Sequence, residues 1–227
     1  MPADRTRPAA FLWDFDGTLA DSEPNWHNAE RRLMAELGSA ITPEQNRQLV
    51  GSALVDSAAQ LLAWAGREDL DAAEYAHILA DHALADMLAT GVGFRPGATE
   101  LLAEVRAAGI ACALVSASYT SILEAITAQL PAHSFDLVIG GDQVKNGKPH
   151  PEPYLTAASR LGVAPIDCLV LEDSVPGTLS AENAGMPTLG VPFEQPLTDG
   201  PRRRVIPTLS GLTLAAASEL WRELAHA

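Results

Sequence analysis

Two aspartates separated by one residue, Asp14 and Asp16, are the side chains best suited to chemistry near the start of this chain. They follow the apolar run of residues 9–13 and precede Gly17 and Thr18, a pattern typical of a buried strand that ends in a turn. Side chains at positions i and i+2 of a strand point to the same side, so both carboxylates would leave the strand end together. Two carboxylates held this close repel one another unless a proton or a cation accompanies them.

The cation that suits such a pair is Mg²⁺, because it prefers hard oxygen ligands and commonly takes one or two carboxylates together with a substrate phosphate. One carboxylate could then attack phosphorus while the other moves protons. An aspartate at a strand-to-helix turn can also serve only as a helix cap, which would account well for one of the two residues but poorly for both. The pair therefore indicates phosphoryl-transfer chemistry.

Further polar groups are expected at the ends of the following strands, where ligands of open parallel sheets bind. Ser116 follows the second core strand, Lys148 lies in the loop after the third, and Glu172 and Asp173 follow the fourth. Each could be a helix cap or a solvated charge when considered alone. Four successive strand ends that carry groups suited to phosphate or metal indicate a single site.

Phosphoryl transfer requires an in-line nucleophile, cations near the phosphate oxygens and a proton donor for the leaving group. We expect Asp14 to be the nucleophile that forms an aspartyl-phosphate, and Asp16 to protonate the leaving alcohol and then activate water. Hydroxyl, backbone N–H and ammonium groups would hold the phosphate, and these come from Ser116, Ala117 and Lys148. The expected Mg²⁺ ligands are Asp14, Asp173 and Glu172.

The elements that must position these residues alternate between helix and strand from residue 98 onward, which predicts a doubly wound, mostly parallel α/β sheet with helices on both faces. The basic run at residues 202–204 is expected to be a solvated turn in a proline-rich loop. The expected strands span residues 9–13, 110–115, 136–139, 168–171 and 188–191. The expected helices span residues 98–108, 121–129, 151–161 and 175–184.

The segment after the first strand has the apolar spacing of helices instead. The chain would thus contain a core of residues 1–21 and 92–227 and an inserted α-helical domain of residues 22–91. Gly and Pro at both junctions would suit hinges or plain turns. The four helices expected in the insert span residues 24–37, 43–50, 52–65 and 70–88.

The ordered set of motifs resembles the haloacid dehalogenase-like superfamily of aspartate-nucleophile phosphotransferases. The family's Asp-x-Asp-Gly-Thr signature is matched by residues 14–18, and its Ser or Thr at the end of the next strand by Ser116. Its Gly-Lys-Pro-x-Pro loop is matched by residues 147–151, and its Glu-Asp-Ser-x-x-Gly motif by residues 172–177. Any one motif is moderately specific, whereas all four in order are strongly so.

This resemblance implies a Rossmann-like core with an inserted four-helix cap, as in the β-phosphoglucomutase-like and phosphoglycolate phosphatase-like branch. Such a cap would close over a small phosphorylated metabolite and exclude water. By resemblance, Asp16 would also offer its backbone carbonyl to Mg²⁺, and Glu172 would act through water. Candidate substrate contacts are Gly51 and Ser52 in a loop of the insert, and His27 and Arg95 near its ends, with an exposed or capping position in the first helix of the insert favoured for His27.

Several functions fit these residues, and a Mg²⁺-dependent phosphatase acting on a small organic phosphomonoester, such as a sugar phosphate, is the leading hypothesis. The alternative is a phosphomutase of the β-phosphoglucomutase type, which is disfavoured because residues 51–54 and 118–120 offer no cation for a second phosphate. A phospho-accepting signalling module fits less well, because such modules lack a helical insert and the second aspartate. An intact site without turnover also stays open.

The composition sets limits on partners and location. A formal net charge of −14 argues against binding to nucleic acid. No apolar stretch is long enough to cross a membrane, and the first ten residues lack the apolar region of a signal peptide, so we expect a cytoplasmic protein. Cys112 and Cys168 each lie in an apolar run and are expected to be buried and unpaired. A monomer or a weak dimer is expected.

Overall fold

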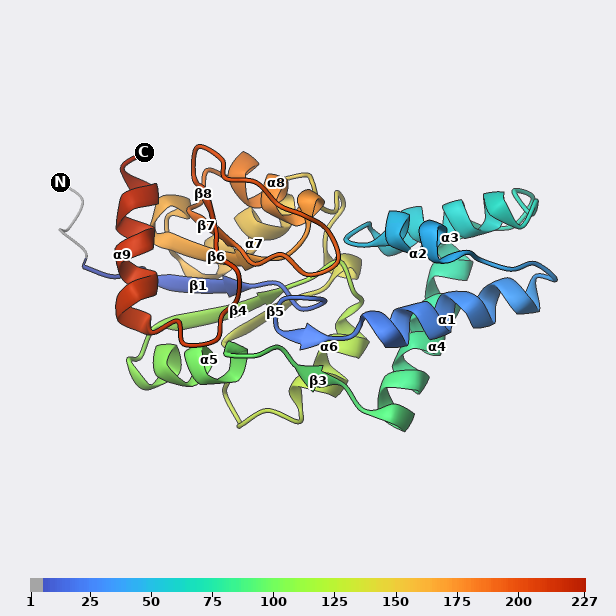
Figure 1. Cartoon of the computed structure of the whole chain (residues 1–227), viewed down its shortest axis with the longest axis horizontal. Coiled ribbons are helices and arrows are strands. Elements are labelled where there is room, and N and C mark those ends of the chain that lie inside the picture. Colours follow the sequence, from blue (N-terminus) through green and yellow to red (C-terminus); the bar gives the residue numbers. More distant parts are fainter. Residues whose placement is uncertain (1–5) are drawn as a thin grey trace.

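The computed structural model describes residues 6–227; residues 1–5, which begin the expected core segment and the stretch expected to lack a signal peptide, lie outside the described part. A six-stranded, wholly parallel sheet forms its centre in the order β5-β4-β1-β6-β7-β8 (Figure 1). The doubly wound α/β architecture is therefore confirmed. The strands are Ala10–Trp13 (β1), Ala111–Val115 (β4), Leu137–Ile139 (β5), Cys168–Glu172 (β6), Thr188–Gly190 (β7) and Arg203–Val205 (β8).

Strand β1 lies in the middle of the sheet and is fully buried. Its last residue, Trp13, pairs with Leu114 of β4 on one side and with Leu171 of β6 on the other. The uninterrupted apolar sequence of β1 follows from this position, because both of its faces are covered by other parts of the chain. The residue that comes next, Asp14, is thereby fixed at the centre of the carboxyl edge of the sheet.

Helices cover both faces of the sheet (Figure 1). Alternate residues of β1 divide between two cores, so that Phe11 and Trp13 pack on the side of α5, α6 and α9 while Leu12 packs on the side of α7 and α8. These helices are Ala98–Ala107 (α5), Thr120–Thr127 (α6), Glu152–Leu161 (α7), Val175–Asn183 (α8) and Leu214–Ala225 (α9).

The four expected helices of the insert are present and lie beyond the carboxyl ends of the strands, on the right in Figure 1. Helix α4 packs against both α1 and α3. It begins two residues later than expected, because the Asp71 side chain accepts a hydrogen bond from the Ala73 N–H and caps the helix there. The helices are Glu23–Glu36 (α1), Pro43–Leu49 (α2), Leu54–Trp64 (α3) and Ala72–Thr90 (α4).

The two connections between the sheet and the insert run side by side. The short strands β2 (Ala20–Asp21) and β3 (Gly93–Phe94) pair antiparallel and form a two-stranded ribbon. Segments expected to be hinges or plain turns are therefore partly ordered by pairing with one another, which ties the beginning and the end of the insert together.

The expectation of a solvated turn at residues 202–204 is wrong for its last two members. Arg203 and Arg204 belong to β8, which pairs parallel with β7 at the edge of the sheet. The Arg203 side chain is largely buried because it donates to the Thr178 hydroxyl (2.7 Å) and lies 3.7 Å from a carboxylate oxygen of Glu182. A basic side chain is tolerated at this edge because it has acidic and hydroxyl partners.

Helix α9 was not expected, although its apolar face completes one core with the nearly buried Trp221 and Leu224. Cys112 and Cys168 are buried and unpaired, as expected. Within residues 6–227, no helix is both long and apolar enough to cross a membrane.

Candidate active site

Asp14 lies at the bottom of a pocket between the sheet and the helical insert. Its backbone N–H donates to the Leu171 carbonyl (3.0 Å), which continues the β1–β6 pairing by one residue. Its Oδ1 accepts a hydrogen bond from Lys148 Nζ at 2.6 Å, whereas its Oδ2 is buried and has no hydrogen-bond partner among the described residues. Desolvation raises the pKa of Asp14 to about 8, although the Lys148 charge opposes this. One oxygen of Asp14 is thus free to meet a ligand.

Lys148 uses all three of its N–H donors inside the protein. Its Nζ donates to Asp14 Oδ1 and to Glu172 Oε1, both at 2.6 Å, and to the Val115 carbonyl at 3.0 Å. Burial disfavours the ammonium, yet the charges of Asp14 and Glu172 outweigh it and hold the pKa of Lys148 well above its usual range. Lys148 is therefore a fixed positive charge at the floor of the pocket.

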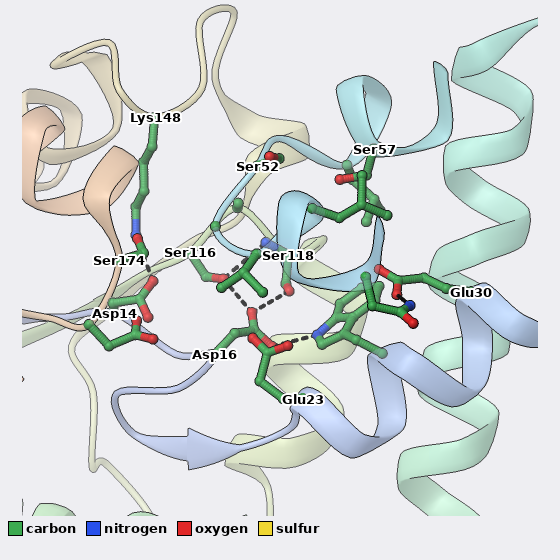
Figure 2. A pocket seen from close by; sticks show the side chains of 18 of the residues that line it. Asp14, Asp16, Glu23, Glu30, Ser52, Ser57, Ser116, Ser118, Lys148 and Ser174 are labelled. Atoms are coloured by element: carbon green, nitrogen blue, oxygen red, sulfur yellow. Dashed lines mark hydrogen bonds and ion pairs between the residues drawn. The ribbon is translucent and has the colours of Figure 1, made fainter. Parts of the chain in front are cut away.

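Asp16 is held by donors from both sides of the pocket. From the insert, the Ser22 hydroxyl (2.6 Å) and the Trp26 indole N–H (2.7 Å) donate to its Oδ1. From the loop after β4, the hydroxyls of Ser116 (3.1 Å) and Ser118 (2.6 Å) donate to its Oδ2. This carboxylate connects the sheet to the helical insert, as the dashed lines in Figure 2 show in part.

The loop after β4 is held in place by its own hydroxyl groups. The Ser116 N–H continues the β4–β5 pairing by donating to the Ile139 carbonyl (3.0 Å). The Ser116 hydroxyl accepts a hydrogen bond from the Ser118 N–H (2.9 Å). Ala117 lies between these two residues and also lines the pocket. Three consecutive residues thus face the space above Asp14 and Asp16.

Three buried carboxylates converge at the floor of the pocket. One oxygen each of Asp14, Glu172 and Asp173 lies within 4.8 Å of the other two. Burial, followed by the charges of Asp14 and Glu172, raises the pKa of Asp173 well above its usual range. Gly17 makes the approach of Asp173 possible, because its φ is +82° and a Cβ at this position would lie 2.2 Å from Asp173 Oδ2.

These carboxylate oxygens are suitable ligands for a magnesium ion. Glu172 is already engaged, since its Oε1 accepts from Lys148 and Tyr154 and its Oε2 accepts from the N–H and the hydroxyl of Ser174. The free acceptor capacity therefore lies on Asp173, which accepts a single hydroxyl bond of 3.2 Å from Thr18, and on Asp14. Asp14 Oδ1 keeps one lone pair beside its Lys148 bond, and Oδ2 has no partner in the described structure. A divalent cation would offset the repulsion between these carboxylates, which is strong because they are buried.

The pocket above this floor has a cavity volume of about 60 Å³ and opens to solvent. In Figure 2, Asp14, Lys148 and Ser174 lie at one side of it and Glu30 at the other, with Asp16 and Ser118 between them. The sheet loops contribute Asp14, Asp16, Ser116, Ala117, Ser118, Lys148, Asp173 and Ser174. The insert contributes Glu23, Trp26, Glu30, Asn46, Leu49, Val50, Gly51, Ser52, Leu54, Ser57 and Leu79.

The family model for haloacid dehalogenase-like hydrolases matches residues 11–191 of the chain. The chain belongs to this family. Hexitol phosphatase B of Escherichia coli (strain K12) is 31% identical in an alignment 215 residues long, which covers 93% of this chain and 96% of that protein. Phosphoglycolate phosphatase of Salmonella typhi is 31% identical in an alignment 207 residues long, which covers 82% of this chain and 81% of that protein.

A solved structure has a similar fold. β-Phosphoglucomutase from Clostridium difficile is 25% identical and superimposes with a TM-score of 0.83 over 95% of this chain and 98% of that one. These similarities confirm the resemblance that the four motifs indicated. The chain is a haloacid dehalogenase-like hydrolase with a parallel core and an inserted helical cap.

Most of the predicted site residues of this hydrolase come together in one pocket. Asp14, Asp16, Ser116, Ala117, Lys148 and Asp173 line it from the sheet, and Gly51 and Ser52 line it from the insert. Glu172 does not line the pocket; it is fully buried, with one oxygen within 4.8 Å of oxygens of Asp14 and Asp173. His27 does not line it; its Nε2 lies 3.7 Å from Glu23 Oε2, and desolvation lowers the pKa of its ring. Arg95 also lies elsewhere, with its guanidinium 3.8 Å from the ring centroid of Phe193. The structure thus gives no support to substrate contacts by these two residues.

Sequence reasoning missed the residues of the hydrolase that line the pocket from α1. Glu23, Trp26 and Glu30 occupy positions i, i+3 and i+7 of this helix and therefore share a face. That spacing was a detectable signal, because two acidic residues stand beside an aromatic one on a face that should otherwise be apolar. Ser118 was missed as well, although it repeats a hydroxyl two residues after Ser116.

Proposed function

We propose that this hydrolase is a Mg²⁺-dependent phosphatase that cleaves a small organic phosphomonoester through an aspartyl-phosphate on Asp14, with sugar phosphates as the first class to test. The observation that carries the proposal is Asp14 Oδ2, a buried and unpartnered carboxylate oxygen at the end of the central strand. The neighbouring Oδ1 is fixed by Lys148, so the free oxygen has a defined direction. The phosphatase names of the two relatives point to the same chemistry.

In the first step, the free oxygen of Asp14 forms a bond to phosphorus while the bond between phosphorus and the leaving oxygen breaks. Asp16, in its protonated form, gives its proton to that oxygen. In the second step, water attacks phosphorus, its proton passes to Asp16, and the bond to Asp14 breaks to release phosphate. Asp16 must give up one of its four accepted hydrogen bonds to take part, because each of its oxygens already accepts two.

The Ser116 hydroxyl and the Ala117 N–H would donate to the phosphate oxygens, and the charge of Lys148, whose three N–H groups are already used, would attract them. Asp14 Oδ1, Asp173 and the Asp16 carbonyl would serve the metal ion, with Glu172 acting through water. When bound, Mg²⁺ would neutralise the carboxylates and the negative charge that develops on the phosphate. The Lys148 ammonium is held by Asp14 and Glu172, so its position does not change with the substrate.

We further propose that residues 22–91 act as a cap on a core formed by residues 1–21 and 92–227. The support is the contact between the α2–α3 loop and the start of α8, where a Cβ on Gly51 would lie 2.9 Å from Ser174 Oγ. The Gln195 side chain also donates to the Arg47 carbonyl across the two parts (3.2 Å). All of these contacts lie within one chain, so a monomer suffices for the proposed site.

Hydrolysis is favoured over the mutase alternative. A mutase of the β-phosphoglucomutase type has to bind a second phosphate, which calls for cationic or amide donors in the cap. Among the described residues that line the pocket, Lys148 alone carries a positive charge, and the carboxylates of Asp14 and Glu172 already hold it. The cap instead presents Glu23 and Glu30.

The decisive experiment measures inorganic phosphate release from a panel of phosphomonoesters, with Mg²⁺ and with EDTA. We expect release that requires Mg²⁺ and falls to background in Asp14→Asn, because an amide is a poor nucleophile. Circular dichroism would verify that the variant is folded. Turnover by Asp14→Asn at most of the wild-type rate would refute the covalent mechanism, and no release from any ester would favour an intact site without turnover.

A further inference from the structure

The cap side of the pocket carries buried polar groups whose hydrogen-bonding capacity is unused. Glu23 is only 6% exposed, and its carboxyl group makes no hydrogen bond to any described residue. Its nearest basic neighbour is His27, at 3.7 Å. In Figure 2 the Glu23 side chain lies beside that of Asp16, at the centre of the pocket. A pocket-lining acceptor without a partner among the described residues is available to accept a hydrogen bond from a ligand that enters the pocket.

A second group of polar side chains lies farther from the phosphate site. The Asn46 amide on α2 donates to Glu30 Oε2 on α1, which leaves Glu30 Oε1 and the Asn46 carbonyl oxygen without described hydrogen bonds. Across from them, the buried hydroxyl of Ser57 on α3 has no described side-chain hydrogen bond. Acceptors and a rotatable hydroxyl donor thus stand on three different helices around one space.

The residues Glu23, Glu30, Asn46 and Ser57 lie on the cap side of the pocket, and we call them the polar wall. The charge of this wall is as informative as its hydrogen-bonding groups. Glu23, Glu30, Asn46 and Ser57 together supply two carboxyl groups, an amide and a hydroxyl, and no described cation on the cap side lines the pocket. A carboxylate or second phosphate on the substrate would have to enter a partly desolvated space in which no described residue of the cap supplies a positive charge to pair it. A hydroxyl group both donates and accepts, so it can satisfy an acid, an amide and a serine alike.

We propose that this wall is the subsite for an uncharged, polyhydroxylated leaving group, with Glu23 accepting a hydrogen bond from a substrate hydroxyl close to the phosphate and Glu30, Asn46 and Ser57 receiving the more distant hydroxyls. Glu23 is then a specificity-determining residue that selects against substrates with a carboxylate or a second phosphate. This inference rests on the phosphatase function proposed above and adds the substrate class.

The test compares kcat/KM for sorbitol 6-phosphate, 2-phosphoglycolate, fructose 1,6-bisphosphate, ethanolamine phosphate and p-nitrophenyl phosphate. We expect the wild type to prefer sorbitol 6-phosphate over the two further-charged anions by about tenfold or more, because the cap side of the pocket has no described cation to pair a second negative charge. Glu23→Gln should lower the ratio of kcat/KM for sorbitol 6-phosphate to that for p-nitrophenyl phosphate by about tenfold, mainly through KM. Glu74→Gln, on the exposed side of α4, is the matched control and should keep the wild-type ratio.

A preference for 2-phosphoglycolate, the bisphosphate or the amine would overturn the proposal, and so would an equal loss on all substrates in Glu23→Gln. Calorimetry separates this result from a failure of the proposed chemistry, because it requires no turnover. Sorbitol 6-phosphate with Mg²⁺ should bind to Asp14→Asn and bind about tenfold more weakly to the Asp14→Asn, Glu23→Gln double variant. Equal binding to both would reject the role of Glu23 even if no ester were hydrolysed.

Discussion

Asp16 is the residue at which the two halves of the site meet, because it accepts hydrogen bonds from Ser22 and Trp26 on one side and from Ser116 and Ser118 on the other. A carboxylate that accepts four hydrogen bonds is well positioned, but it has no free lone pair with which to hold a proton. Its proposed role as acid and base therefore requires a rearrangement that loosens at least one of these bonds. The bonds from the α1 side are the ones that a movement of the cap would release.

Asp16→Asn should slow hydrolysis of a sugar phosphate by about 10²–10⁴-fold, the usual contribution of general acid–base catalysis. The first step should suffer less with p-nitrophenyl phosphate, because nitrophenolate leaves without a proton. Stopped-flow measurements should then show a burst of nitrophenol followed by slow release of phosphate. Asp81→Asn, on the exposed side of α4, is the control. An unchanged steady-state rate for Asp16→Asn would remove Asp16 from the mechanism.

Asp173 offers a readout of metal binding that does not depend on activity. It is buried beside Asp14 and Glu172, which raises its pKa, so Asp173→Asn removes a carboxyl group whose burial beside other acids costs stability. In EDTA we expect the variant to melt at a higher temperature than the wild type. Mg²⁺ at 100 times its Kd should stabilise the wild type by about 2.7 kcal/mol and the variant much less, which calorimetry can measure. The same magnesium-dependent shift in both proteins would count against Asp173 as a ligand.

At the scale of elements, the contact between α1 and α2 depends on a buried acid. Glu30 accepts a hydrogen bond from Asn46, and burial raises its pKa to about 7 even though this bond opposes the shift. Because the folded-state pKa is raised, the protonated form stabilises the fold below about pH 4.5, and this contribution is lost as the pH rises through about 7.

Glu30→Gln should therefore flatten the pH dependence of stability. Between the unfolded-state pKa of 4.5 and the folded-state pKa of about 7, the wild type should lose on the order of 2 kcal/mol more than the variant. Chemical denaturation of both proteins at several pH values measures this difference, and groups common to both cancel in the comparison. Parallel stability curves for the two proteins would show that Glu30 is ionised in the folded state.

The elements that could be predicted from the sequence are those with a strong local signal. The central strand and the four helices of the insert follow from apolar spacing and helix-capping residues, and their ends differ from expectation by a few residues. The strands β2, β3 and β8 were missed because segments of two or three residues are too short to show a periodic apolar pattern. In β8, the burial of Arg203 also depends on Thr178 and Glu182 of α8.

The same reasoning applies to the site. Asp14, Ser116, Lys148 and Asp173 could be placed together because the ends of parallel strands meet at one edge. The ion pair between Lys148 and Glu172 could not be predicted from the sequence, because it depends on side-chain positions. The polar wall of the cap could not be predicted either, because it depends on the packing of three helices against the core.

For the whole molecule, the formal net charge of −14 opposes the approach of an anionic phosphate ester. Raising the ionic strength from about 10 mM to about 150 mM shortens the Debye length from roughly 30 Å to roughly 8 Å and screens this repulsion. At saturating Mg²⁺, kcat/KM for a phosphate monoester should therefore rise with salt, by about twofold or more. A fall in kcat/KM over this range would instead indicate a local positive field that attracts the substrate.

The central position of β1 also bears on how the molecule opens. Its backbone is hydrogen-bonded to β4 and β6 on both sides and buried on both faces, so its amide protons should exchange with solvent only through global unfolding. The helices of the insert have no such double support and can exchange through smaller, local openings. Substitutions that loosen these helices would then change which molecules are accepted well before they disturb the carboxylate at the end of β1.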